Sequence, residues 1–112
     1  MELHYSETDH GIRMMRLTGK LDMIGVGEIE TQFAGQCSGD NVRVIVDLAG
    51  VDFLTSMGLR LFLLTGKSVA SRGGRLVLLN PTDLVREELT LTGVDATLPV
   101  YMDLEKALRA LR

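Results

Sequence analysis

Aromatic side chains are scarce in this sequence, which has no tryptophan and only 4% aromatic residues. A platform on which nucleobases stack, or an aromatic shelf that binds a sugar, is therefore not expected. An excess of positive charge is also missing, because 12 Lys and Arg residues stand against 15 Asp and Glu residues and the net charge at neutral pH is −3. Binding to nucleic acid without regard to sequence needs a clustered basic face, so we expect no nucleic-acid partner.

Long apolar runs and cysteine pairs are missing as well. The apolar run at residues 61–64 is far shorter than the roughly 20 residues that a membrane-spanning helix needs. The first residues do not combine a basic region with an apolar stretch, so we expect neither a signal peptide nor insertion into a membrane. The single cysteine, Cys37, has no partner for an internal disulfide. These features are typical of a cytoplasmic protein.

Catalytic constellations are incomplete. A serine hydrolase needs Gly-x-Ser-x-Gly at a strand-to-helix turn, but Leu54 occupies the first glycine position before Ser56. A base for that serine would have to come from His4 or His10, which both lie near the N-terminus. We therefore expect no serine hydrolysis and no catalytic residue of this type.

Cofactor and metal motifs are also incomplete. Residues 25–30 begin like a dinucleotide-binding fingerprint, but Glu30 stands in place of the third glycine. No Cys/His spacing supports a zinc site. Asp22, Asp47 and Asp52 could cluster at strand ends around a cation, although acidic residues are common in solvated turns. We expect no cofactor and no metal.

What the chain does contain is a regular alternation of strand-like and helix-like segments. The order of β-β-α-β-α-β-α-β-α predicts an α/β fold with a mixed, mostly parallel sheet and helices packed against it. The length suits a single domain over residues 1–112. The predicted strands are residues 3–8, 12–17, 42–48, 75–79 and 97–101, and the predicted helices are residues 26–36, 59–70, 81–92 and 104–111.

Two helix starts can be read from capping residues. Asn80 followed by Pro81 predicts an N-cap and a first helical position, and Asp103 predicts the cap of the last helix. Ser56 lies in the turn between the predicted strand at residues 42–48 and the predicted helix at residues 59–70. A serine there caps free N–H groups, and it also occupies a position where a phosphate would be tolerated.

Apolar side chains accompany this serine. Met23 and Ile24 lie in a predicted loop at residues 23–27, and Met57 follows Ser56 directly. If both segments lie at the same end of the sheet, these residues form an exposed apolar patch of the kind that binds partner proteins. The alternative is that each methionine fills a local gap in the core.

Four segments match a known family in order and spacing. Residues 16–22 (RLTGKLD) resemble its L-x-G-x-L-D motif at the end of the second strand, and residues 44–48 resemble its hydrophobic-Asp-Leu central strand. Residues 53–60 (FLTSMGLR) are similar to its F-I-D-S-S-G-L or I-S-S-A-G-L-R segment, and residues 73–76 (GGRL) to its G-G-x-hydrophobic segment. Together they resemble the STAS domain, which is found in bacterial anti-sigma-factor antagonists.

The resemblance implies a protein that binds a partner and is switched by phosphorylation. In that family, an anti-sigma factor with a histidine-kinase-like ATPase fold phosphorylates one serine of the antagonist. Phosphorylation ends the binding that frees the sigma factor for transcription, and a serine phosphatase restores it. The acceptor maps onto Ser56, and Thr55, which stands where antagonists usually have Asp, is the second candidate.

The same resemblance implies a surface for the partner and no catalytic role for this chain, which would be a substrate of the kinase and the phosphatase. A monomer or a weak dimer is expected. The residues expected to contact the partner are Asp22, Met23, Ile24, Asp52, Thr55, Ser56, Met57 and Arg60.

Two other functions stay open from the sequence. The first is a STAS adaptor of a stressosome or a transporter that is never phosphorylated and in which Ser56 is only a helix cap. The second, more remote, is a small enzyme.

Overall fold

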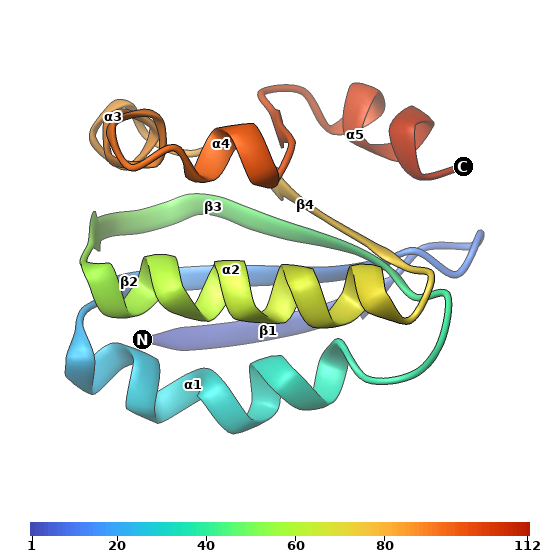
Figure 1. Ribbon diagram of the computed structural model, residues 1–112, viewed down its shortest axis with the longest axis horizontal. Helices are drawn as coiled ribbons and strands as arrows, with labels where there is room; N and C mark the ends of the chain where they lie inside the picture. The colour runs from blue at the N-terminus through green and yellow to red at the C-terminus, as the bar shows by residue number, and fades with distance from the viewer.

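The computed structural model describes all 112 residues, which form one five-stranded sheet and five helices (Figure 1). The strands are β1 (Glu2–Glu7), β2 (Arg13–Leu21), β3 (Arg43–Leu54), β4 (Arg75–Leu79) and β5 (Val100–Tyr101). The helices are α1 (Met23–Gln36), α2 (Ser56–Ser71), α3 (Asp83–Leu91), α4 (Val94–Thr97) and α5 (Leu104–Leu111).

The sheet is mixed and mostly parallel, as the sequence predicts. Its strand order is β1-β2-β3-β4-β5, and only the β1–β2 pair is antiparallel. Strands β1 and β2 therefore form a hairpin, and β2 and β3 are both interior strands. Each parallel neighbour is reached through a helix, which is the connection that parallel strands require.

The core is divided by the sheet into a large and a small part. Side chains alternate along β3, so that Val44 and Val46 point into the large core and Ile45 points into the small one. Helices α1 and α2 cover the large core, which side chains of α3 and α4 complete. The small core lies on the other face beneath α5, which contributes Ala107 and Leu111. The strands of residues 42–48 and 75–79 are thus buried on both faces, as their continuous apolar runs indicate.

Both strands that lead to Ser56 and to Met23 are longer than predicted. Strand β2 continues to Leu21 and β3 continues to Leu54, because their parallel pairing resumes after irregularities in the register. At the second irregularity, Gly19 pairs with Val51 and Lys20 pairs with Phe53, so Asp52 is an extra residue on β3. Such a β-bulge bends the strand and redirects the side chains beside it.

Several helix boundaries differ from the predicted ones. Helix α1 begins at Met23 rather than at residue 26, and α2 begins at Ser56 rather than at residue 59. The N-cap of α3 is Thr82 and not Asn80, which has a left-handed φ of 52° and donates its N–H to the Tyr101 carbonyl. The strand predicted at residues 97–101 is shorter in the structure, because Thr97 ends the short helix α4 and only Val100–Tyr101 form β5.

The apolar residues of α2 and α3 do not all face the core. Ala70 of α2, and Leu84 and Leu91 of α3, are exposed, while Val69 and Val85 are buried. None of the helices has both the length and the apolar character needed to cross a bilayer.

Candidate functional site

The candidate site lies where β2 and β3 end side by side. Leu21 pairs with Leu54, and in each strand one residue then leads directly into a helix. Asp22 is the N-cap of α1, and Thr55 is the N-cap of α2. The two helices therefore start next to each other at one end of the sheet (Figure 1). The sequence placed both segments in loops, whereas the structure has two single-residue junctions.

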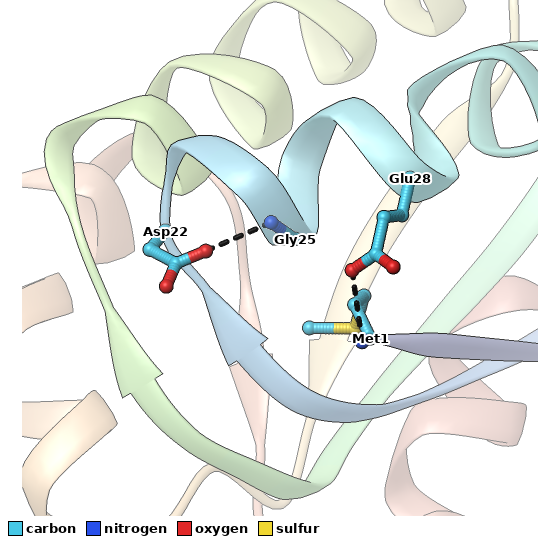
Figure 2. Close-up of polar contacts among 4 residues, drawn as sticks. All are labelled: Met1, Asp22, Gly25 and Glu28. Carbon is cyan, nitrogen blue, oxygen red and sulfur yellow. Dashed lines mark hydrogen bonds and ion pairs between the residues drawn. The ribbon is translucent and has the colours of Figure 1, made fainter.

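The first junction is held by a capping bond and by a glycine. A side-chain oxygen of Asp22, Oδ1, accepts a hydrogen bond of 2.8 Å from the Gly25 N–H (Figure 2). A Cβ on Gly25 would lie only 1.9 Å from the carbonyl oxygen of Lys20, so the helix approaches β2 too closely for any side chain. One turn further on, Glu28 of α1 accepts a 3.2 Å bond from the amino group of Met1 (Figure 2). These contacts fix the start of α1 on the end of β2 and its following turn on the residue that precedes β1.

The second junction is held by Thr55. Its hydroxyl oxygen Oγ1 donates a 2.7 Å hydrogen bond to the carbonyl of Leu21, and its main-chain N–H donates a 3.1 Å bond to the same oxygen. The hydroxyl is thus used to join the two junctions and does not cap α2. Ser56 is the first residue of α2 and not its cap, which corrects the interpretation from the sequence. Its side chain is exposed.

Replacing Thr55 with valine is expected to lower the free energy of unfolding by about 1 kcal/mol, because the bond from its hydroxyl to the Leu21 carbonyl is lost. The main-chain bond remains, which keeps the loss modest. Thr55→Ser retains a hydroxyl and is the matched control, with a smaller expected loss. Urea unfolding of both variants measures the difference. A larger loss for Thr55→Ser than for Thr55→Val would show that the methyl group, rather than the hydroxyl, stabilises this junction.

Exposed apolar side chains surround the two junctions. Met23 is 72% exposed, Ile24 71% and Met57 43%. The alternative in which the methionines fill gaps in the core is therefore wrong, and the three apolar side chains that were expected to be exposed are exposed. Phe53 adds a large side chain that is 45% exposed. The sequence did not reveal it, because only the bulge at Asp52 lets Val51 and Leu54 both point inward while Phe53 points out. We call Met23, Ile24, Phe53 and Met57 the junction patch.

The three aspartates considered as ligands of a cation have separate roles. Asp22 caps α1, Asp47 lies 3.8 Å from Arg16, and Asp52 is exposed in the bulge. The structure contains no group of three or more His, Cys, Asp or Glu side chains arranged to hold a metal ion. The cation site considered from the sequence does not form.

The histidines lie away from Ser56. Arg43, the first residue of β3, donates to the carbonyl of His10, whereas Ser56 follows the last residue of that strand. His10 and Ser56 are therefore separated by the length of β3. His4 lies on β1 beside Glu2. Neither imidazole is placed to act as a base for the Ser56 hydroxyl.

Cys37 is at the far end as well. Burial raises the pKa of its thiol to about 11, and this effect exceeds the opposite one from the nearby Arg13 and Arg72 guanidinium groups. The thiol therefore stays protonated at neutral pH, and a protonated, buried thiol is a poor nucleophile.

Comparison with known proteins identifies the family. The model of the STAS domain matches residues 6–107. The chain belongs to the STAS domain family.

Relatives of this STAS domain share its whole length. It is 30% identical to BtrV of Bordetella bronchiseptica, whose name describes it as an anti-sigma factor antagonist, over 100% of this chain and 96% of the relative. A crystal structure of an anti-sigma factor antagonist from Mycobacterium paratuberculosis has a TM-score of 0.86 at 28% identity and covers 99% of this chain and 93% of that one. The phosphorylated form of the Bacillus cell fate determinant SpoIIAA has the same fold, with a TM-score of 0.70 at 22% identity over 99% of this chain and 100% of that one.

Proposed function

We propose that this STAS domain is an anti-sigma-factor antagonist that binds its anti-sigma factor through the junction patch and is switched off by phosphorylation of Ser56. The observation that carries the proposal is an exposed Ser56 at the start of α2, directly followed by the exposed Met57 and beside the junction at which Met23 and Ile24 are exposed. The names of the relatives support the class of partner. The complex would form in the cytoplasm, where it would free a sigma factor for transcription.

Ser56 is a better acceptor than Thr55. The Thr55 side chain is half-buried and its hydroxyl already donates to Leu21, so a phosphate there would break the bond between the two junctions. Ser56 is exposed, and its hydroxyl makes no hydrogen bond within the chain. A kinase reaches the serine without disturbing the fold, whereas the threonine would first have to be released.

The fold and the interface respond differently to a phosphate on Ser56. A phosphoserine carries about −1.5 to −2 charges, and at a helix N-terminus an anion is stabilised by roughly 0.3–1 kcal/mol. Helix α2 has no acidic residue in its first turn that would oppose it. In a protein interface, however, the same dianion loses its water, which costs several kcal/mol unless a cation meets it. The interface effect is larger, so phosphorylation ends binding while the domain stays folded.

The proposed chemistry is a phosphoryl transfer in which this chain is the substrate. The Ser56 oxygen attacks the γ-phosphorus of ATP held by the anti-sigma factor, the bond from that phosphorus to the β-phosphate oxygen breaks, and ADP leaves. The hydroxyl proton passes to a base of the kinase. A serine phosphatase reverses the modification by hydrolysis. The chain itself supplies no catalytic group to either step.

The adaptor alternative loses its main support. In that function Ser56 would serve only as a helix cap, but the N-cap of α2 is Thr55. The exposed Ser56 hydroxyl has no structural bond that would explain a serine at this position.

Incubation with the purified cognate anti-sigma factor and ATP tests the proposal. We expect one phosphate on Ser56 by mass spectrometry, none on Ser56→Ala, and full phosphorylation of Thr55→Val at Ser56. Cognate serine phosphatase should remove the phosphate. Absence of phosphate from the unaltered chain, or its appearance on Thr55, would contradict the proposed switch.

A further inference from the structure

A hollow on the outer side of α2 begins at Ser56. It has a volume of about 330 Å³ and lies between α2 and the segment that leads into α4. Leu59, Leu63 and Val94 are among its apolar lining residues, and Arg60 and Lys67 are its two cations. Ser56 and Arg60 therefore border the same space. The junction patch lies outside it, because none of the patch residues lines the hollow.

The Arg60 side chain differs from most other arginines of the chain because it has no partner. Its guanidinium is exposed and makes no hydrogen bond or ion pair. Arg60 lies one helical turn after Ser56. The arginines that do have partners are engaged with main-chain carbonyls or with Asp47, and they are Arg13, Arg16, Arg43, Arg72 and Arg75. Helix α2 also contains no acidic residue that would compete for Arg60. This cation is free to bind an anion.

We propose that Arg60 is the intramolecular counter-ion of phosphoserine at position 56. The assignment rests on the proposed function, since it concerns the phosphorylated form of the same serine. Residues four apart on a helix lie about 6 Å apart along its axis and face the same side. A guanidinium donates two parallel hydrogen bonds to a phosphate, which gives the pair a defined geometry. The phosphate is thereby held against α2 at the entrance of the hollow.

The pair would make the switch act in two ways. Phosphorylation adds a dianion at Ser56, and it also neutralises Arg60, which is then unavailable to a carboxylate of the partner. Asp95 of α4 follows the lining residue Val94 and accepts a hydrogen bond from the Thr90 hydroxyl, and it does not line the hollow. At the end of the sheet, Lys20 and the carboxylates of Asp22 and Asp52 do not line it either. The two carboxylates repel a phosphate, which favours its position on the Arg60 side.

The test uses protein in which phosphoserine is placed at position 56 during translation, so that no kinase is needed. Phosphorus NMR then follows the second ionisation of the phosphate, which has a pKa of about 6 when unperturbed. A nearby cation lowers this pKa because it favours the dianion. We expect Arg60→Gln to raise it by roughly half a unit, because the pair is exposed to water, and Arg60→Lys to raise it less.

Lys67→Gln is the matched control, since it removes an equal charge from the same hollow. Lys67 lies eleven residues after Ser56, which is about 16 Å along the helix. We expect Lys67→Gln to leave the phosphate pKa unchanged within about 0.1 unit. Identical titrations for the unaltered chain and Arg60→Gln, or equal shifts from Arg60→Gln and Lys67→Gln, would overturn the assignment. The result does not depend on any kinase, so it stands apart from failure of the proposed phosphorylation.

Discussion

Replacing Gly25 with alanine is expected to lower the free energy of unfolding by about 3 kcal/mol, which is the upper end of the range for an overpacked site. The added Cβ would lie 1.9 Å from the carbonyl oxygen of Lys20 and 3.3 Å from the capping oxygen of Asp22. The nearest atom belongs to the backbone of β2, which cannot rotate away as a side chain does. The start of α1 must therefore shift and lose the capping bond. For a domain of this size, the melting temperature should fall by roughly 10–20 °C.

Gly27→Ala is the control for this change, because it lies on the same helix two residues further on. A Cβ at position 27 meets no atom within 4 Å. Alanine favours a helix over glycine by about 1 kcal/mol, so this variant is expected to be more stable than the unaltered chain. Urea unfolding of both variants gives the two free energies. A stable Gly25→Ala protein would show that α1 does not approach β2 as closely as the structure has it.

The sequence predicts the architecture because the architecture depends on local periodicity. The β-branched run at residues 42–48 and the spacing of Val26, Ile29 and Phe33 each specify an element and its buried side. The order of these elements then leaves few topologies, and the mixed sheet follows. The type of each element and its buried side depend on residues that are close in the sequence, so both can be predicted without knowledge of the rest of the chain.

The candidate site was harder to predict because it depends on contacts between distant segments. Gly25 and Gly27 disfavour a helix, and the sequence therefore indicated a loop, but the close approach of α1 to Lys20 requires the first of these glycines. Thr55 and Ser56 both carry a hydroxyl that suits a helix start. What distinguishes them is the carbonyl of Leu21, which is 34 residues from Thr55 and takes its hydroxyl. The exposure of Phe53 depends on a β-bulge that no local sequence pattern predicts.

Replacing Ser56 with aspartate is expected to weaken binding of the cognate anti-sigma factor by about 100-fold, which corresponds to about 2.7 kcal/mol. The carboxylate, and Arg60 if the two side chains pair, would have to lose their water within the interface around the junction patch, and this desolvation can cost more than the pairing returns. The fold should tolerate the same charge, because position 56 is exposed and begins a 16-residue helix whose first turn contains no acidic residue. The melting temperature should therefore change by no more than about 2 °C.

Ser56→Asn separates charge from size, since asparagine has the shape of aspartate without its charge. We expect Ser56→Asn to bind within about tenfold of the unaltered chain, because an amide loses its water at a much lower cost than a carboxylate. Isothermal titration calorimetry against the purified anti-sigma factor measures both affinities, and thermal unfolding measures both stabilities. Equal weakening by the two substitutions would mean that the interface rejects bulk rather than charge. A large loss of stability with unchanged affinity would mean that Ser56 serves the start of α2, and the switch would then have to lie elsewhere.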